Sequence, residues 1–302
     1  MASIGLKVIR GLVGVGEVVS PRLAGRAAFE LFRRTPPQRS LSDGERRAIG
    51  RASAFMSEAR HHRIKTSAGC VAVHEFRPRQ MRSKGTVLMI HGWRSRTEYM
   101  RALIEGYVSA GHKVVSLDLP GHGGSPGRAL DMGKAVEAVS LAGQWFGPFA
   151  AIVGHSFGGA IAVNAAAGTV SGFAAVPAER LVLIAAPNSM PRLFEEFGRY
   201  LDLGARTQKA MEQQVERVTG RPLAQFVSSR LLARLPIPVM VMHAPDDHEV
   251  PAAEAHAMAA AGNHVRMFWA DGLGHRRILS DATVVRTAID FVTDRLVPEY
   301  VQ

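Results

Sequence analysis

The sequence predicts an α/β fold in which a mostly parallel sheet of eight strands is flanked by helices, with a small helical cap and an N-terminal helical extension. Strand-like and helical segments alternate from His61 onward. The later strand segments, such as Val87–Ile90 and Val239–Met242, are apolar without interruption, which is typical of parallel strands that are covered on both faces. A chain of 302 residues is long enough for one large domain of this kind.

The helical extension is expected to comprise residues 1–58. Apolar residues recur at helical spacing near its beginning, which predicts an amphipathic helix over residues 4–19. These residues are Ile4, Val8, Leu12, Val15 and Val19. The uncharged stretch 11–16 is much shorter than the roughly 20 apolar residues of a membrane span. The helix therefore either packs against the domain or makes peripheral contact with an anionic membrane surface, and the sequence leaves both alternatives open.

Two more helical segments are expected before the sheet begins. A second amphipathic segment follows Pro21 and runs to Phe32, and residues 34–37 form a linker. A polar helix is then expected from Ser42 to Met56.

The main domain is expected to cover residues 59–302. Its predicted strands are His61–Thr66, Val71–Phe76, Thr86–Ile90, Lys113–Leu117, Ala150–Val153, Leu181–Ala185, Pro238–Met242 and Val265–Trp269. An insertion at about 188–235 interrupts the alternation, and its apolar stripes predict the short helices of a cap. The stripes are Phe194, Phe197 and Leu201, then Met211, Val215 and Val218, then Leu223, Phe226 and Val227. A cap over the sheet edge would shape an apolar pocket and limit the access of water.

Composition argues against several classes of function. Lys and Arg outnumber Asp and Glu by 37 to 26, but the basic residues are scattered and match no nucleic-acid-binding motif, so no nucleic-acid partner is expected. No metal is expected either, because the histidines do not show the spacing of known metal sites. The single cysteine, Cys70, excludes an intramolecular disulfide, and we expect it to be buried in an apolar stretch.

Two serines satisfy the pattern G-x-S-x-G. Ser156 stands between a strand segment and a small-residue helical segment, where Gly154 and Gly158 would let the two backbones approach each other. Ser125 is followed by Pro126, which has no N–H to stabilise an oxyanion, and no strand leads into it. Ser156 is therefore the candidate nucleophile, and Ser125 is expected to be a turn residue.

A serine hydroxyl is a weak nucleophile unless a histidine removes its proton and a carboxylate orients that histidine. Asp246 and Asp247 follow a predicted buried strand. His275 lies in a glycine-flanked loop after the last predicted strand. These residues are the candidate partners of the serine.

Taken together, the motifs resemble the α/β-hydrolase superfamily, in its serine esterase and lipase type. The landmarks occur in the order His91-Gly92-Trp93, Asp118 to Ser125, Gly154 to Gly158, Asp247-His-Glu-Val-Pro251 and Gly274-His275. The resemblance covers residues 63–292. It implies Ser156 as nucleophile, His275 as general base and then general acid, and Asp247 as the carboxylate that orients the imidazole. Asp247 fits the D-x-x-V-P spacing of the family, whereas Asp246 is one position early. His155 and His243 are expected to be packing and hydrogen-bonding residues near the site.

The resemblance also implies an oxyanion hole made by the backbone N–H groups of Trp93 and Phe157. The indole of Trp93 either walls the pocket or packs in the core. Met190, Phe194 and Phe197 are expected to line the substrate pocket, unless the phenylalanines merely dock the cap.

The expected reaction is hydrolysis of a small-molecule carboxylic ester or thioester through an acyl-enzyme on Ser156, with no cofactor. The alternatives are hydrolysis of amide or C–C bonds with the same triad, and a non-catalytic scaffold that binds a ligand. The expected location is cytoplasmic, with or without peripheral membrane contact. The sequence does not determine the natural substrate, the acyl-chain preference, the oligomeric state or whether the cap moves.

Overall fold

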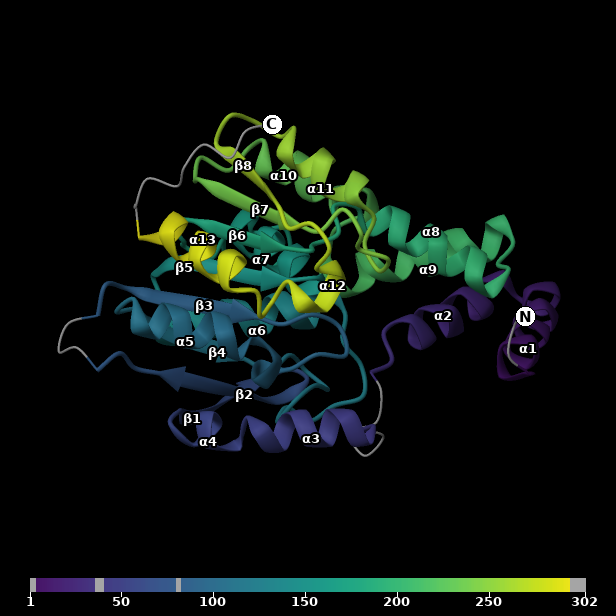
Figure 1. Ribbon diagram of the computed structural model, residues 1–302. Helices are drawn as coiled ribbons and strands as arrows, with labels where there is room; N and C mark the ends of the chain where they lie inside the picture. The colour runs from purple at the N-terminus through teal and green to yellow at the C-terminus, as the bar shows by residue number, and fades with distance from the viewer. Residues whose placement is uncertain (1–3, 36–40, 80–82, 294–302) are drawn as a thin grey trace.

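The computed structural model describes residues 4–35, 41–79 and 83–293. Within these residues, eight strands form one sheet in the order β1-β2-β4-β3-β5-β6-β7-β8 (Figure 1). The strands are β1 (Arg60–Thr66), β2 (Gly69–Phe76), β3 (Thr86–Ile90), β4 (Lys113–Leu117), β5 (Phe149–His155), β6 (Leu181–Ile184), β7 (Val239–His243) and β8 (Val265–Trp269). β2 is antiparallel to β1 and β4, and the other neighbouring strands are parallel. The prediction of a mostly parallel eight-stranded sheet is confirmed.

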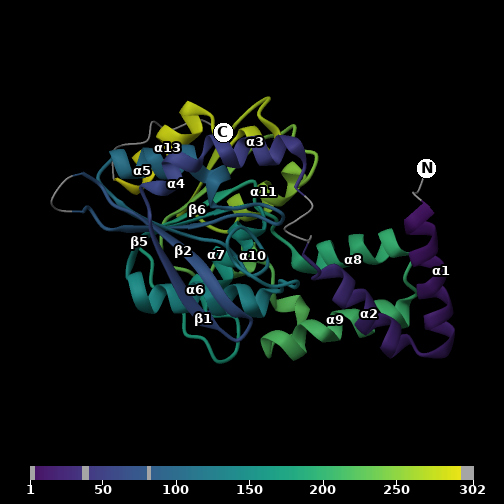
Figure 2. The same cartoon turned by 90° about the horizontal axis from the view of Figure 1, so that it is seen from below.

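Helices cover both faces of the sheet (Figure 2). One face carries α6 (Met132–Phe146), α7 (Phe157–Ala167), α10 (Ser228–Leu232) and α11 (Ala252–Ala259), and the other carries α3 (Asp43–Arg51), α4 (Ser53–Ser57), α5 (Arg101–Ser109) and α13 (Ala282–Val292). Alternate residues of a strand point to opposite faces. In β3, Leu88 and Ile90 therefore join the core under α6 and α7, while Val87 and Met89 join the core under α5 and α13. Burial on both faces explains why the strand is apolar throughout.

Four helices project from one side of the sheet and form what we call the cap lobe (Figure 1). They are α1 (Ile4–Val19), α2 (Pro21–Phe32), α8 (Met190–Leu201) and α9 (Ala205–Thr219). α2 packs closely along α9, because a Cβ at Gly25 would lie only 2.7 Å from the Cβ of Ala210 and from backbone atoms of Thr207 and Met211. The first two helices of the chain are thus joined to the insertion of residues 188–235.

The rest of the N-terminal extension forms α3 and α4, and α4 packs on the sheet. α3 begins with a capping box, in which the Ser42 hydroxyl accepts the N–H of Glu45 and the Glu45 carboxylate accepts the N–H of Ser42. The expected polar helix is divided at Ala52 into α3 and α4. Phe55 of α4 stacks on Phe76 of β2, with ring centroids 4.7 Å apart.

The prediction that a third cap helix begins at Leu223 is wrong. Leu223 opens a 3-10 turn (Leu223–Gln225), and Phe226 and Val227 then leave helical backbone, with φ −88°, ψ 61° and φ −120°, ψ 109°. Val227 instead pairs with Ser189 in an isolated bridge, and α10 begins only after it. This bridge ties the two ends of the insertion together.

The expected burial of Cys70 is also wrong, because the side chain is exposed. Cys70 pairs with Lys65 near the turn of the hairpin that joins the edge strand β1 to β2, and it lies before the part of β2 that pairs with β4. Burial begins only at Val71, one residue further along β2. The apolar neighbours of the cysteine are buried because helices cover the middle of the strand.

Candidate active site

Ser156 occupies the turn between β5 and α7. Its backbone has φ 54° and ψ −127°, a conformation that side chains rarely adopt and that is strained. Glycines make the turn possible, because a Cβ at Gly154 would collide with the carbonyl of Gly158, and a Cβ at Gly158 with the carbonyl oxygens of Ile90 and His91. The strand and the helix therefore approach very closely, which is the geometry of a nucleophile elbow.

His275 and Asp247 are brought together although they lie 28 residues apart in the sequence. Asp247 follows β7 and His275 lies on α12 (Gly274–Arg277) after β8, so two parallel neighbouring strands bring their loops to the same sheet edge. His275 Nδ1 lies 2.7 Å from Asp247 Oδ2. The other carboxylate oxygen accepts the N–H groups of Glu249 and Val250 at 2.8 and 2.9 Å. With Nδ1 engaged, Nε2 of His275 is the nitrogen that remains for proton transfer.

The environment of Asp247 favours its ionised form. Burial by itself would raise the pKa of the carboxyl group, but hydrogen bonds from His275 and from the N–H of Val250 outweigh burial and hold the pKa below its ordinary value. Asp246 lies one residue earlier, and its carboxylate accepts the N–H of Gly274 at 3.3 Å. Asp246 therefore braces the backbone next to His275, while Asp247 holds the imidazole.

The surroundings of Ser125 indicate a structural role. Its side chain is fully buried. The hydroxyl donates to the carbonyl oxygen of Asp118 at 2.6 Å and accepts the N–H of Ala72 at 2.8 Å. It thus joins the loop after β4 to β2, and a hydroxyl that is buried and hydrogen-bonded in this way is not placed to attack a substrate.

Two buried histidines support the loops of the site. Nε2 of His155 donates to the carbonyl oxygen of His275 at 2.9 Å, and Nε2 of His243 donates to that of Val250 at 2.9 Å. Burial lowers the pKa of His155 to about 3. His155 is therefore neutral at ordinary pH and holds the backbone of His275 without competing for its proton.

The two candidate oxyanion donors lie on segments that adjoin Ser156. Phe157 is the first residue of α7, so its N–H has no acceptor within the helix, and a helix N-terminus favours negative charge. The N–H of Trp93 meets no acceptor within the described part of the chain. A Cβ at Gly92 would lie 2.8 Å from the Cβ of Ser156, so only glycine lets this loop pass so close to the elbow.

Buried His91 fixes the start of the loop that carries Trp93. Its Nδ1 donates to the carbonyl oxygen of Gly92 at 2.8 Å, and its Nε2 accepts the N–H of Leu119 at 2.9 Å. Only a neutral imidazole can donate from one nitrogen and accept at the other. Burial also lowers the pKa of His91, in agreement with this protonation state.

His122 fixes the other side of the same loop. Its Nδ1 donates to the carbonyl oxygen of Pro120 at 3.1 Å, and its Nε2 accepts the N–H of Arg94 at 3.0 Å. Burial lowers the pKa of His122 to about 4. No spacing along the chain predicts this role of His122, because the contact joins residues from two different loops.

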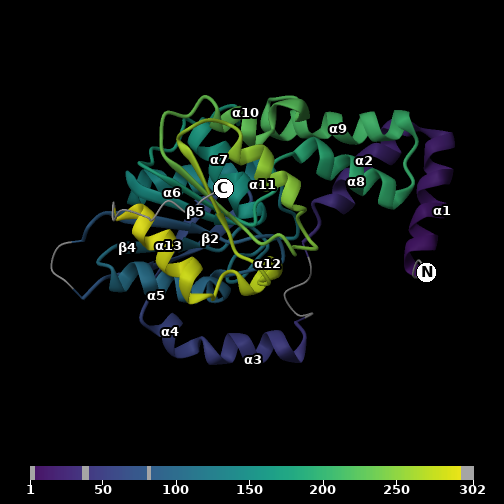
Figure 3. The same cartoon turned by 45° about the horizontal axis from the view of Figure 1, so that its top comes forward.

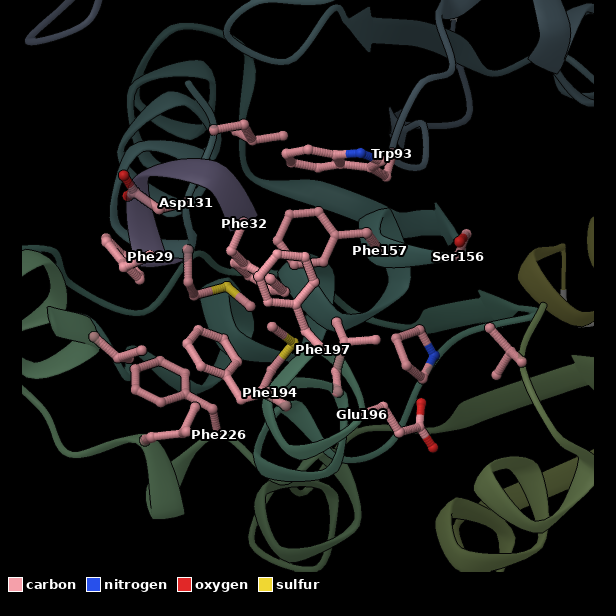
Figure 4. A pocket seen from close by; sticks show the side chains of 18 of the residues that line it. Phe29, Phe32, Trp93, Asp131, Ser156, Phe157, Phe194, Glu196, Phe197 and Phe226 are labelled. Carbon is pink, nitrogen blue, oxygen red and sulfur yellow. The ribbon is translucent and has the colours of Figure 1, made fainter. Parts of the chain in front are cut away.

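A cavity of about 470 Å³ lies beside Ser156 and under the cap lobe. Figure 4 shows Ser156 toward one end of the cavity and Asp131 and Phe226 toward the other. Most of its wall is apolar and comes from Phe29, Phe32, Trp93, Met132, Phe157, Met190, Leu193, Phe194, Phe197, Val215, Val218, Leu223 and Phe226. His275 also lines the cavity. An apolar group held there would therefore lie next to both the serine and the imidazole.

The expected pocket residues have two roles at once. Met190, Phe194 and Phe197 line the cavity. Phe32 packs against Phe194 and Phe197, with ring centroids 4.4 and 5.1 Å apart, and Phe29 lies 6.3 Å from Phe194. The phenylalanines thus shape the pocket and dock α2 on α8.

Sequence reasoning missed Phe29 and Phe32 as pocket residues. Their spacing of three residues on an amphipathic helix marks an apolar face, but it does not say which surface that face meets. The two expectations for the indole of Trp93 are that it walls the pocket or that it packs in the core. It does both, because it lines the cavity and also packs against the core.

A second carboxylate lies near His275. Glu249 Oε2 is 3.8 Å from Nε2 of His275, and Glu249 Oε1 accepts a hydrogen bond from Arg276 at 3.1 Å. Glu249 is about half exposed, so solvent screens its charge. Across the described ranges, no group of three or more His, Cys, Asp and Glu side chains is arranged to hold a metal ion.

The chain is similar to known hydrolases in sequence and in fold. The model of the Alpha/beta hydrolase family matches residues 87–288. A pimeloyl-[acyl-carrier protein] methyl ester esterase of Xanthomonas campestris pv. campestris is 28% identical, over 67% of this chain and 92% of that protein. Est1E from Butyrivibrio proteoclasticus, solved with ferulic acid bound, superposes with a TM-score of 0.64 at 16% identity, over 78% of this chain and 99% of that one. Naproxen esterase (carboxylesterase NP) from Bacillus subtilis gives 0.58 at 13% identity, over 83% and 99%.

Proposed function

The chain belongs to the alpha/beta hydrolase family, and from this premise we propose that it hydrolyses carboxylic esters with Ser156 as nucleophile. One observation carries the proposal: the paired side chains of His275 and Asp247 lie at the same sheet edge as the strained elbow of Ser156, and His275 and Ser156 line one apolar cavity. The esterase names of several relatives agree with this chemistry.

In the first half-reaction, Ser156 Oγ attacks the carbonyl carbon of the ester while Nε2 of His275 takes the hydroxyl proton. Asp247 keeps the proton on Nδ1 of His275 and stabilises the imidazolium. The carbonyl oxygen becomes an oxyanion, and the N–H groups of Trp93 and Phe157 stabilise it. When the tetrahedral intermediate collapses, the C–O bond to the alcohol breaks and His275 returns its proton to the leaving oxygen.

In the second half-reaction, water replaces the alcohol. His275 takes a proton from the water, the resulting hydroxide attacks the acyl carbon, and the same two N–H groups stabilise the second oxyanion. Collapse releases the carboxylic acid, and the proton on His275 returns to Ser156. The cycle uses only side chains and backbone groups of this chain, and a thioester would follow the same steps with a thiol as leaving group.

The apolar cavity favours substrates with a bulky apolar acyl part of medium length or an aromatic ring. Aromatic and aliphatic walls bind such groups by burying their surface, at about 25 cal/mol per Å². The wall near Ser156 includes Trp93 and Phe157. Hydrolysis of amides or C–C bonds would use the same triad, so variants of the triad do not distinguish these reactions from ester hydrolysis. A series of substrates with different scissile bonds does.

The test is hydrolysis of p-nitrophenyl esters of increasing acyl length by wild type, Ser156→Ala and Ser125→Ala. We expect Ser156→Ala to abolish turnover while it stays folded. Ser125→Ala should keep turnover, although it leaves buried partners unpaired and should lower the stability by about 1–3 kcal/mol. Circular dichroism checks the fold of each variant.

A fluorophosphonate probe adds a readout that does not depend on the choice of ester. It should label the wild type and Ser125→Ala but not Ser156→Ala. A wild type that neither turns over any ester nor reacts with the probe would contradict the proposal and support a ligand-binding scaffold. Labelling without ester turnover would point to amide, thioester or C–C substrates at the same serine.

A further inference from the structure

The apolar side of α1 points away from the rest of the protein. Its side chains are largely exposed. Their exposed fractions are 55% for Val8, 69% for Leu12, 66% for Val15, 89% for Val18 and 79% for Val19. We call these residues the apolar face of α1. Leu23, at the start of α2, extends the exposed surface (66%). Exposed apolar residues that are contiguous in this way usually mark an interaction site.

The inner side of α1 holds the helix on the cap lobe through partly buried Ile9, which packs against the core, and through two polar side chains. The Arg10 guanidinium donates from Nε and Nη2 to the carbonyl oxygen of Tyr200, at 3.0 and 2.7 Å. The Glu17 carboxylate accepts the N–H of Gly204 at 2.7 Å. An amphipathic helix on a globular protein normally turns its larger apolar side inward. In α1 the inner side instead carries Arg10 and Glu17 beside Ile9, and the larger apolar side faces outward.

The position of α1 leaves this face accessible. In Figure 3, α1 runs across the outer ends of α8 and α9, at the extremity of the cap lobe. Figures 1 and 2 show the same position from two other directions. The apolar face of α1 therefore lies where a broad, flat partner can reach it.

The charge around this face identifies the partner. Residues 4–26, which form α1 and the first half of α2, contain four Lys and Arg residues against one Glu residue, a formal charge of +3, within a chain of net charge +11. Lys7, Arg22 and Arg26 are exposed. An apolar strip flanked by basic side chains is the pattern of a helix that lies in the plane of an anionic membrane surface. A second copy of the chain fits less well, because it would bring two basic surfaces together.

From these observations we propose that α1 docks the protein on an anionic lipid surface, with the apolar face of α1 inserted among the lipids and the basic residues near the headgroups. No helix within the described ranges is long and apolar enough to cross a membrane, so the contact is peripheral. α1 rests on α2 and α8, whose Phe32 and Phe197 line the cavity. Docking would hold the cap lobe at the surface where apolar molecules dissolve. The proposal rests on the orientation of α1 and not on the reaction at Ser156.

The experiment measures co-sedimentation of the full chain with vesicles of phosphatidylcholine alone or of equal parts phosphatidylcholine and phosphatidylglycerol. The test variant is Leu12→Gln with Val15→Gln, which keeps good helix formers in α1. We expect the wild type to bind the anionic vesicles preferentially. The variant should bind at least about tenfold less, since two apolar side chains no longer enter the lipid. Arg22→Gln with Arg26→Gln should weaken binding to the vesicles that contain phosphatidylglycerol and should not change binding to vesicles of phosphatidylcholine.

Two controls separate the apolar face of α1 from general stickiness and from catalysis. Trp145→Gln removes an exposed apolar side chain (63%) on α6 and should bind like the wild type. Ser156→Ala should also bind like the wild type, so a failure of the proposed reaction does not affect this test. Equal binding of the wild type and the Leu12/Val15 variant would overturn the proposal. The proposal would also be overturned if the wild type did not bind vesicles and instead formed a dimer that the Leu12/Val15 variant does not form. Light scattering measures the dimer.

Discussion

His122 Nε2 accepts the backbone N–H of Arg94 across 3.0 Å, and this bond joins the loop after β4 to the loop that carries Trp93. The bond needs an unprotonated Nε2, which burial of the imidazole secures by lowering the pKa to about 4. The position of a proposed oxyanion donor thus depends on a histidine that does not contact the substrate.

We expect His122→Ala to reduce kcat by roughly 10- to 100-fold with little change in KM. Loss of one oxyanion donor costs about 3 kcal/mol of barrier, and here the donor is misplaced rather than removed. His122→Gln keeps an acceptor and should recover part of kcat. A KM increase without a kcat decrease, or no recovery with glutamine, would show that His122 has only a packing role.

Asp247→Asn should lower kcat by about 10⁴-fold, because an amide no longer holds the correct imidazole tautomer of His275. Asp246→Asn is the matched control, since the Asp246 carboxylate accepts the N–H of Gly274 and an amide oxygen can do the same. Steady-state kinetics with one ester measures both. Equal losses in the two variants would contradict the separate roles of the two aspartates.

Phe32→Ala should shift the preferred acyl chain to longer esters. The ring packs 4.4 Å from Phe194 in the cavity wall, and its removal enlarges the space for substrate. The ratio of kcat/KM between long and short p-nitrophenyl esters measures the shift. Leu23→Ala, on the exposed side of the same helix, should leave the ratio unchanged, and an equal shift in both variants would argue against a direct role of Phe32.

Gly25→Ala should destabilise the protein by about 1–3 kcal/mol, because the new Cβ would meet Ala210 and the backbone of α9 at 2.7 Å. Gly14→Ala on α1 is the matched control. A Cβ there meets no atom within 4 Å, and alanine favours a helix over glycine by up to about 1 kcal/mol. Denaturant unfolding gives both values, and a neutral Gly25→Ala would show that α2 does not pack tightly on α9.

Stability should fall as the pH is lowered below about 6.5. His122 and His155 have pKa values lowered to about 4 and about 3 in the folded protein, whereas the unfolded value is about 6.5. The unfolded chain therefore binds more protons in this window, and the free energy of unfolding decreases as the pH falls. Below about pH 4, Asp118 and Asp247, whose pKa values are also lowered, add to the loss.

Thermal melts at constant ionic strength from pH 8 to pH 4 measure this dependence. His122→Gln removes one of the histidines and should make the decrease in Tm between pH 7 and pH 5 less steep than in the wild type. A wild-type Tm that stays constant over that interval would mean that the buried histidines are not kept neutral by the fold.

The sequence by itself determined the features that depend on neighbours along the chain. Uninterrupted apolar runs such as Leu181–Ile184 indicated strands buried on both faces, and all eight expected strands are present. Gly154 and Gly158 marked a turn that only small residues permit. Pro126 argued against Ser125, and the spacing to Pro251 favoured Asp247, which the structure places 2.7 Å from His275.

Only the tertiary structure decided the features that depend on contacts between distant segments. The periodicity of α1 marked an apolar side, but the bonds from Arg10 and Glu17 to the cap lobe turn that side toward solvent. Phe32 enters the pocket because α2 packs on helices far along the chain. The physical reason is that the spacing of residues within a helix records which side is apolar, whereas the surface that this side meets is set by long-range packing.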